Sequence, residues 1–561
     1  MPPKDTQSEY QALKEELHFH NYRYHVLNDP VISDSEFDQK LKRLKSIEET
    51  HPDWVTPDSP SQRAGAEPLA QFVKVEHPAP ILSLGNAFGE SDLREWYARI
   101  ALIDNRVAGA DFTVEPKLDG LTVVLHYNNG TFVQGATRGN GEVGEDITEN
   151  LRTIKALPLH IPITEDGPPL PEVLVVRGEA LITKADFEAL NQRLEEAGGK
   201  TYLNPRNTAA GSLRQLDSRI TAQRPLTLLV YAIVHHEGGE IPATQWETLN
   251  YLRELGFPVA DTSTLCSTLD EAIALCLETD PDAFPFEVDG MVIKLNDLSL
   301  ADDLGVVGKD PRGAIAYKFP AQEVTTLLQD IRVNVGRTGV ITPYAVLEPI
   351  EIGGVVVKQA TLHNFDFIHD KDIRVGDRVL VKRAGEVIPY VIGPIEDVRT
   401  GTEEPYTPPS TCPSCSEPII NPVGEVAYYC TNSACPAQLV RNLEHFVSRD
   451  AIDIVGLGIN TVQQLVQEEL VHDIADLYQL EPSQLSALEG FAEKKAENLV
   501  SAIQASKTQP LWRLIVGLGI HGVGEVAAQA LAERYHDLDA LSRTSQDEIE
   551  SIEGFGPNIA Q

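Results

Sequence analysis

Four of the six cysteines of this chain lie close together, at Cys412, Cys415, Cys430 and Cys435. Their spacing, C-x2-C-x14-C-x4-C, suits four thiolates that converge tetrahedrally on one Zn²⁺ ion. Because four protein ligands leave no open coordination position, we predict a structural zinc site. Two disulfides, or small buried apolar residues, are the alternatives. We expect the two other cysteines, Cys266 on a strand and Cys276 on a helix, to be such small buried apolar residues.

Length and composition restrict the class of protein. The 561 residues predict roughly four domains, and 42% hydrophobic with 23% charged residues is the composition of an ordinary globular protein. The longest apolar run, 226–234, is far shorter than the ~20 residues that a membrane helix needs. The first residues are polar and carry no secretory signal. We therefore expect a cytoplasmic protein without a membrane partner.

The net charge of −38 would normally argue against a nucleic-acid partner, because such a partner is a polyanion. The acidity is unevenly distributed, however. Residues 310–390 hold ten Lys and Arg against ten Asp and Glu, and residues 202–224 hold four Arg against one acidic residue. Locally basic surfaces are therefore compatible with this sequence.

Periodicity divides the chain into five regions and predicts a multidomain α+β protein. Residues 1–70 show helical spacing that ends in prolines, and residues 71–320 mix β-branched runs with helical stretches such as 184–197. Residues 321–405 are rich in Val, Ile, Thr and Gly with frequent turns, which is typical of a small β-barrel. The cysteine segment, 406–437, and a helical region, 438–561, follow.

The helical region repeats a short turn four times. Gly456-Leu-Gly458, Gly490-Phe-Ala492, Gly522-Val-Gly524 and Gly554-Phe-Gly556 are separated by 34, 32 and 32 residues. Glycines allow such a turn to present backbone N–H groups at a helix N-terminus, where they can bind a phosphate without a lysine. The alternative is a helical bundle whose turns only close hairpins. The sequence ends before a second helix of the fourth hairpin, so we expect it to be incomplete.

Four short segments carry charged residues at or beside apolar runs. They are Glu115-Pro-Lys117-Leu-Asp119-Gly120, Arg177-Gly178-Glu179, Val288-Asp289-Gly290-Met291-Val292-Ile293-Lys294 and Tyr317-Lys318-Phe319. A lone K-x-D-G segment is weak, and Lys117 by itself would be a solvated lysine. In this ordered series, the charged side chains can point into one cleft. There they could hold a phosphorylated nucleotide against a lysine nucleophile.

This series resembles the nucleotidyltransferase superfamily of DNA ligases and capping enzymes. Further segments are similar to the bacterial NAD-dependent DNA ligases in particular: Tyr24-His25, DSEFD (34–38), SLGNAF (83–88), ATRGNGEVGEDITEN (136–150), NPRNTAAGSLRQLD (204–217), VGRTGVITPYAVLEP (335–349), ATLHN (360–364) and RAGEVIP (383–389). The likeness covers residues 10–561. It implies an N-terminal helical domain, an adenylation (nucleotidyltransferase) domain, an OB-fold, a four-cysteine zinc finger and a helix-hairpin-helix domain.

The resemblance implies that this chain seals nicks in double-stranded DNA, as a monomer, in replication and repair. Lys117 would attack NAD and carry AMP, with Mg²⁺ (or Mn²⁺) assisting. Only a neutral amine is nucleophilic, and neutralising a lysine of pKa ~10.4 near neutral pH costs about 4 kcal/mol unless the site helps. A neighbouring cation such as Lys294 could lower that pKa.

The resemblance also implies the roles of individual residues. The catalytic residues would be Lys117, Asp119, Glu179, Asp289, Lys294 and Lys318. The adenylate half of the cofactor would be bound by Ser83, Leu84, Glu115, Arg138, Glu179, Lys294 and Lys318. DNA would be bound by Arg206, Arg214, Gly456, Gly458, Gly522 and Gly524.

The nicotinamide mononucleotide half would be bound by the N-terminal region, through Tyr24, His25, Asp34, Ser35, Glu36, Phe37 and Asp38. By itself this stretch would be taken for an ordinary helical core with surface carboxylates. Two positions depart from the family pattern. Phe37 stands where a tyrosine is usual, and Pro281 stands where we expect an arginine that contacts phosphate or DNA.

Two other classes of protein remain open at this point. A nucleotidyltransferase that uses ATP or GTP would share the lysine series but would not need the Tyr-His and DSEFD segments. A non-catalytic DNA-binding scaffold would need only the barrel, the cysteines and the hairpins.

Overall fold

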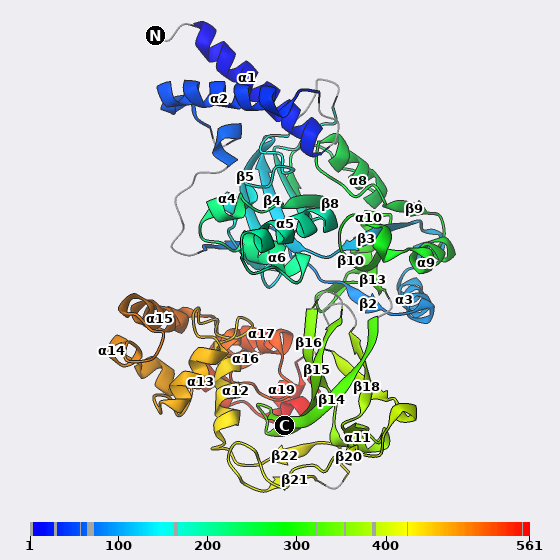
Figure 1. The fold of residues 1–561 in the computed structure, drawn as a ribbon, viewed down its shortest axis with the longest axis vertical. Coiled ribbons are helices and arrows are strands. Elements are labelled where there is room, and N and C mark those ends of the chain that lie inside the picture. Colours follow the sequence, from blue (N-terminus) through cyan, green and yellow to red (C-terminus); the bar gives the residue numbers. More distant parts are fainter. Residues whose placement is uncertain are drawn as a thin grey trace. The chain divides into compact units, whose positions relative to one another are not determined.

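The computed structural model describes residues 4–26, 31–56, 58–63, 72–161, 167–319, 322–352, 355–383, 389–422, 424–552 and 554–561. The chain forms two compact units, residues 1–321 and 322–561. Figure 1 labels the elements of both. The limits predicted between domains inside each unit stay predictions. In the described part of the chain, no helix is long and apolar enough to cross a bilayer.

The first unit begins with two helices, α1 (Lys4–His25) and α2 (Asp34–Thr50), which pack against each other. Tyr10, Leu17, Leu44 and Ile47 form their buried core. The sequence starts α2 at Ser33, whose hydroxyl accepts from the Glu36 N–H while the Glu36 carboxylate accepts from the Ser33 N–H. The N-terminal helical region is thus confirmed.

Two larger β-sheets, with helices and two short strand pairs around them, follow in the first unit (Figure 1). The four-stranded sheet has the order β5-β4-β7-β8, and the five-stranded sheet has the order β2-β13-β10-β3-β9. The strands are β1 Lys74–Glu76, β2 Gly85–Ala87, β3 Phe112–Leu118, β4 Leu121–Asn128, β5 Thr131–Thr137, β6 Val143–Glu145, β7 Val173–Leu181, β8 Thr227–Glu237, β9 Thr264–Cys266, β10 Val288–Leu295, β11 Val306–Val307, β12 Asp310–Pro311 and β13 Ala314–Lys318. The helices are α3 Glu90–Ile103, α4 Thr148–Leu151, α5 Lys184–Glu196, α6 Pro205–Leu213, α7 Ser218–Thr221, α8 Gln245–Glu254, α9 Leu269–Glu278 and α10 Leu298–Leu304.

Alternation along the strands separates an apolar face from a polar face in the five-stranded sheet. Val114 of β3, Ile293 of β10 and Ile315 of β13 belong to one buried core. Their neighbours in sequence point to the opposite side, which carries charged residues. Cys266 and Cys276 are both buried in this core, as the sequence predicts.

Strand β3 is longer than the sequence suggests. The run FTVE covers only residues 112–115, but the strand continues through Pro116 and Lys117 to Leu118. Proline has no N–H to donate, and it is tolerated here because β9 pairs only with residues 112–114. Lys117 therefore lies within a strand that is held on one side by β10.

The second unit contains the predicted barrel. The strands β14 (Gln322–Val335), β18 (Arg378–Arg383), β19 (Tyr390–Pro394), β16 (Val355–Thr361) and β15 (Val340–Ile352) follow one another, and β14 also pairs with β15. That last pairing closes the sheet into a five-stranded barrel. Most of the RAGEVIP segment (384–388) lies outside the described residues. The other elements are α11 Phe365–Asp370, β17 Arg374–Val375, β20 Glu404–Pro405, β21 Ile419–Ile420 and β22 Tyr428–Cys430.

A pair of helices surrounds each of the four predicted glycine turns. We expected no second helix in the fourth hairpin, but the short helix α20 (Pro557–Ala560) follows Gly556. The helices are α12 Pro436–Val447, α13 Ile459–Gln467, α14 Pro482–Leu485, α15 Glu493–Ala505, α16 Leu511–Gly517, α17 Glu525–Arg534, α18 Leu538–Ser542, α19 Gln546–Glu550 and α20 Pro557–Ala560. Helix α12 packs on α13, α14 on α15, α16 on α17, and α19 on α20. The first glycine of each turn has a positive φ, for example 90° at Gly456, which explains the choice of glycine.

Arg63, at the end of a short 3-10 helix (Pro60–Arg63) after α2, connects the N-terminal region to the segment that follows α4. Its guanidinium donates to the carbonyl oxygens of Arg152 (3.2 Å), Ile154 (2.8 Å) and Leu157 (2.9 Å). Burial lowers the pKa of Arg63 to about 10, so the group stays charged at neutral pH. Asn21 of α1 adds a bond to the Lys155 carbonyl at 2.8 Å.

We expect Arg63→Met to weaken the docking of α1 and α2 by roughly 2–4 kcal/mol, because three carbonyls lose a charged donor. Faster amide hydrogen exchange in residues 4–26 and 152–157 would report this loss. Arg43→Met is the control, since Arg43 is exposed on α2 and pairs only with Glu9 among the contacts recorded for it. Equal exchange in both variants would contradict the role of Arg63.

Candidate active site and metal centre

A cavity of about 620 Å³ lies between the two sheets of the first unit. Strands β3, β10 and β13 of one sheet and β4, β7 and β8 of the other contribute to its wall. Among the predicted site residues, the structure places nine in the lining: Ser83, Leu84, Glu115, Lys117, Arg138, Glu179, Arg206, Lys294 and Lys318. Residues that are far apart in the sequence thus meet at one cavity.

Two lysines face each other across a glycine. Gly290 of β10 pairs with Lys117 of β3 on one side and with Lys318 of β13 on the other. A Cβ at position 290 would lie 2.1 Å from the Tyr317 carbonyl oxygen, so only glycine fits between these strands. The register of β10 shifts between Val288 and Gly290, and this bulge contains Asp289.

Asp289 binds both of these lysines. Its carboxylate lies 3.0 Å from Lys117 Nζ and also accepts from Lys318 Nζ. The side chain of Lys117 is 23% exposed, so the amine reaches the cavity without entering bulk solvent. Burial, and then the nearby Lys117 ammonium, lower the pKa of Lys318. The cation that shares a carboxylate with Lys117 is therefore Lys318, whereas we expected Lys294 beside it.

Lys294 pairs with Glu115 instead. Its Nζ lies 2.8 Å from Glu115 Oε2, and the other carboxylate oxygen accepts from Thr113 Oγ1 (3.2 Å) and Gln245 Nε2 (2.9 Å). Glu115 is 4% exposed. A buried carboxylate with a lysine and two hydrogen-bond donors is a rigid acceptor for a ligand in the cavity.

Glu179 is a cavity residue whose pKa is strongly shifted. Its Oε2 accepts from Thr122 Oγ1 at 3.0 Å and from the Tyr231 hydroxyl at 3.4 Å. Burial raises the pKa of Glu179 to about 7, and the Thr122 hydrogen bond opposes this shift. Carboxyl groups that titrate near neutral pH and lie beside a cavity are common in functional sites.

Two arginines bind the segment that precedes β2. Arg138 donates to Ser83 Oγ at 2.5 Å, and Arg177 donates to the Leu82 carbonyl at 3.1 Å. Burial, followed by the nearby Arg177, lowers the pKa of Arg138. The SLGN segment is thus held at the cavity by the strands behind it.

Asp119 and Asp289 do not line the cavity but bind residues that do. Arg206 of α6 donates to Asp119 Oδ1 at 2.6 Å, a pair that sequence reasoning missed. Arg214 lies outside the cavity lining and pairs with Glu145 at 3.1 Å. Pro281 lies in a short 3-10 helix, where its carbonyl accepts from Lys184 Nζ at 3.4 Å.

The predicted nicotinamide-binding residues lie where α1 ends and α2 begins. Burial lowers the pKa of His25 to about 4, with Lys155 and Arg63 adding to the shift. Glu36 takes part in the N-cap of α2, and Phe37 packs on the core of the two helices. The side chains of four others, Tyr24, Asp34, Ser35 and Asp38, lie outside the described part of the structure.

Thr122, Tyr231 and Gln245 line the cavity and bind its carboxylates, but the sequence analysis named none of them. Thr122 and Tyr231 belong to β-branched or apolar runs, so the sequence signals only a strand. Gln245 follows Thr244, which is the N-cap of α8, and the sequence signals only a helix start. Their proximity to Glu115 and Glu179 arises from the pairing of strands and could not be predicted from spacing.

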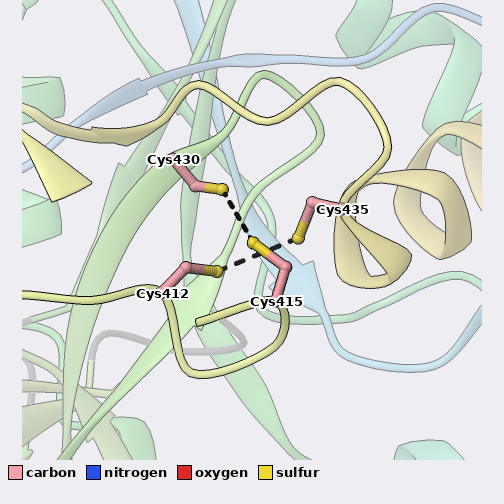
Figure 2. Close-up of side chains that lie close together, drawn as sticks. All are labelled: Cys412, Cys415, Cys430 and Cys435. Carbon is pink, nitrogen blue, oxygen red and sulfur yellow. Dashed lines mark hydrogen bonds between the residues drawn. The ribbon is translucent and has the colours of Figure 1, made fainter. Parts of the chain in front are cut away.

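The four clustered cysteines converge in the second unit (Figure 2). Their Sγ atoms all lie within 4.8 Å of one another, with Cys412 and Cys435 at 3.8 Å and Cys415 and Cys430 at 3.5 Å. A tetrahedron with Zn–S bonds of ~2.3 Å has S–S edges of about 3.8 Å. The donors therefore fit a zinc ion, which would cross-link this segment.

Comparison with known families now identifies the chain. Family models match in order along it: a DNA ligase-like N-terminal NAD+-binding domain (3–65), the NAD-dependent DNA ligase adenylation domain (69–322), its OB-fold domain (325–403) and its C4 zinc finger domain (411–437). Two helix-hairpin-helix models match residues 448–505 and 513–561. The chain belongs to the NAD-dependent DNA ligase family.

Curated relatives agree with this assignment. A DNA ligase of Roseiflexus sp. (strain RS-1) is 52% identical over 98% of this chain and 78% of its own length. DNA ligases of Chloroflexus aggregans and Halothermothrix orenii are 51% and 47% identical, over 96% and 99% of this chain and 81% and 82% of their own lengths. The chain is thus a DNA ligase that uses NAD and carries a C4 zinc finger. Mg²⁺ is expected for the family, and DNA replication and repair follow from it.

The zinc-binding segment also connects to the barrel. Strand β22 pairs with β15, and the Cys430 N–H donates to the Gly339 carbonyl at 2.8 Å.

We expect one zinc ion per chain and its loss in Cys412→Ser. Amide hydrogen exchange in β15 should then be faster, because the strand paired with it loosens. The Cys266→Ser variant should keep full zinc content, because Cys266 lies outside the cluster. Full zinc content in Cys412→Ser, measured by elemental analysis, would contradict the predicted ligands.

Proposed function

We propose that this ligase seals 5′-phosphate/3′-hydroxyl nicks in duplex DNA through a lysyl-AMP intermediate on Lys117. The observation that carries the proposal is the placement of the Lys117 amine at the cavity, close to a second lysine, Lys318. Asp289 binds the amine, and Lys318 shares that carboxylate. Lys117 and Lys318 repel each other across this carboxylate, and burial together with this repulsion lowers the pKa of Lys318.

In the first step, neutral Lys117 Nζ attacks the α-phosphorus of NAD. An N–P bond forms, the P–O bond to nicotinamide mononucleotide breaks with its electron pair leaving on that oxygen, and the proton of the amine passes to solvent. Lys318 and Lys294 stabilise the negative charge that develops on the phosphate oxygens. We assign the adenylate to the cavity because its volume of about 620 Å³ suits a nucleotide and its polar groups converge from both sheets.

Other cavity residues would bind the parts of the adenylate that do not react. Glu115 suits the base, since its buried carboxylate is a fixed acceptor. Glu179 suits the ribose hydroxyls, and Ser83, Leu84 and Arg138 complete the wall. The nicotinamide mononucleotide half would lie against the N-terminal helices, at Tyr24, His25, Asp34, Ser35, Glu36, Phe37 and Asp38.

The AMP then passes from Lys117 to the 5′-phosphate of the nick, and the 3′-hydroxyl displaces AMP to form the phosphodiester bond. Arg206, held by Asp119, and Arg214 would bind DNA phosphates. Four hairpin turns offer further contacts at Gly456, Gly458, Gly522 and Gly524 and their repeats. Helices α13 and α17 begin at glycines without a side-chain cap, so their first N–H groups can bind phosphate oxygens.

The ions have separate roles in this proposal. Zinc cross-links the cysteine segment beside the barrel and takes no part in the chemistry. A divalent cation such as Mg²⁺ would neutralise phosphate charge when bound. Glu179 would help to hold it through Oε1, since the Thr122 and Tyr231 hydroxyls donate to Oε2 at 3.0 and 3.4 Å. We expect the enzyme to work as a monomer.

Replacing the nucleophile tests the proposal directly. Lys117→Ala should lose essentially all labelling by NAD while binding a nicked duplex with nearly unchanged affinity, because the lost role is covalent. Radiolabelled NAD and a gel-shift assay measure the two properties. Lys200→Ala, at an exposed lysine outside the cavity lining, is the control. Full labelling of Lys117→Ala would refute the assignment.

The titration of Glu179 gives a pH signature. Its folded pKa of about 7 is raised from the usual 4.5, so the carboxyl is protonated below pH 7 and ionised above it. Glu179→Gln stays neutral at every pH. We expect the rate of lysine adenylylation, wild type relative to variant, to rise about tenfold as pH increases through 7, because a carboxylate accepts hydrogen bonds more strongly than an amide. A constant ratio would contradict this role.

A further inference from the structure

Gln245 is a buried polar residue at the start of α8, and it takes no part in the chemical steps described above. It lines the cavity and is 4% exposed. Its amide nitrogen donates to Glu115 Oε1 at 2.9 Å and to the Tyr231 carbonyl oxygen at 3.0 Å. Both partners are acceptors only, so the orientation of the amide is fixed by chemistry.

These two bonds join the sheets on either side of the cavity. Glu115 belongs to β3 of the five-stranded sheet, and Tyr231 belongs to β8 of the four-stranded sheet. One NH₂ group thus connects the two walls at the point where Glu115 faces the cavity. A shift of either wall would break one of the two bonds.

The backbone of Gln245 is fixed as well. Its N–H donates to the Asn296 carbonyl at 2.7 Å, and the next N–H, of Trp246, donates to Asn296 Oδ1 at 2.9 Å. Asn296 follows directly on β10, the strand that carries Lys294. Lys294 in turn binds Glu115 at 2.8 Å. The helix start, the lysine and the carboxylate therefore form one connected network.

We propose that Gln245 is a positioning residue that fixes the Glu115 carboxylate as the acceptor for the amino group of the purine base of NAD. This inference rests on the proposed function, in which the adenylate occupies the cavity. Gln245 and Thr113 donate to one carboxylate oxygen and Lys294 to the other, so the group cannot rotate. An ionised carboxylate has about four lone-pair positions, and one remains for the ligand.

The network predicts selectivity between purine bases. A fixed acceptor binds an amino group at position 6 of the purine, whereas a 6-oxo group would place an acceptor against it. Nicotinamide hypoxanthine dinucleotide differs from NAD by this replacement. Gln245 touches no reacting atom, so its loss should weaken binding of the dinucleotide and leave the chemical step nearly unchanged.

The first variant is Gln245→Met, which keeps the volume and removes the donor. We expect the KM for NAD to rise about tenfold with kcat within about twofold, because a buried charged acceptor loses a partner. The preference for NAD over nicotinamide hypoxanthine dinucleotide should fall by a similar factor. The matched control is Gln192→Met, since Gln192 also donates to a glutamate, at 3.1 Å, but is exposed on α5.

The second variant, Gln245→Glu, separates positioning from folding. It keeps the shape but places a carboxyl against Glu115, and the pair regains a hydrogen bond only when it holds a proton. Besides these two carboxyls, the network contains the Lys294 ammonium and the Thr113 hydroxyl. We expect the ratio of the KM of this variant to the KM of wild type to fall towards one as the pH falls from 8 to 6. The same ratio for Gln245→Met should stay constant.

The outcomes are distinct. Unchanged KM and base preference in Gln245→Met, or a fall in kcat at constant KM, would overturn the positioning role, because a smaller folded fraction lowers kcat alone. A KM of Gln245→Glu that does not recover at low pH would also overturn the positioning role. Binding of a nicked duplex without adenylate needs no nucleotide in the cavity and should be normal in both variants. Failure of the wild-type chain to become adenylylated would instead refute the proposed function, in the same assay.

Discussion

The shared ion pair of Lys117, Asp289 and Lys318 is the interaction on which the active-site architecture depends. Two ammonium groups approach one carboxylate because β3, β10 and β13 are neighbours, and because Gly290 leaves space between them. The bulge in β10 contains Asp289, the residue that binds both lysines. If the strands shifted by one residue, the lysines would point into the apolar core of Val114 and Ile293. The chemistry of the lysine therefore follows from strand register.

The distribution of charge explains how such an acidic chain can act on DNA. The net charge is −38, yet the cationic side chains of the cavity are held by specific partners: Lys294 by Glu115, and Arg206 by Asp119. The helical hairpins offer another source of positive potential, because backbone N–H groups at Gly458 and Gly524 carry it without lysine. Acidic surface elsewhere does not remove these local sites.

Sequence patterns predicted the elements better than their contacts. The cysteine spacing, the four glycine turns and the barrel composition each encode a local structure, and the structure contains all three. The pairing of Lys294 with Glu115, and the place of Lys318 beside Lys117, depend on which strands are neighbours. Gln245 and Thr122 gave no signal, since their contacts join segments far apart in the sequence. The roles of individual residues stay predictions.

The central claim is that the Lys117 amine takes AMP from NAD. Intact-mass analysis of the zinc-loaded chain after incubation with Mg²⁺ and either NAD or ATP, followed by peptide mapping, tests this claim most directly. The account predicts that the chain gains one AMP group, located on Lys117, with NAD and none with ATP. A gain with ATP but not with NAD, or an AMP group on another residue, would contradict it.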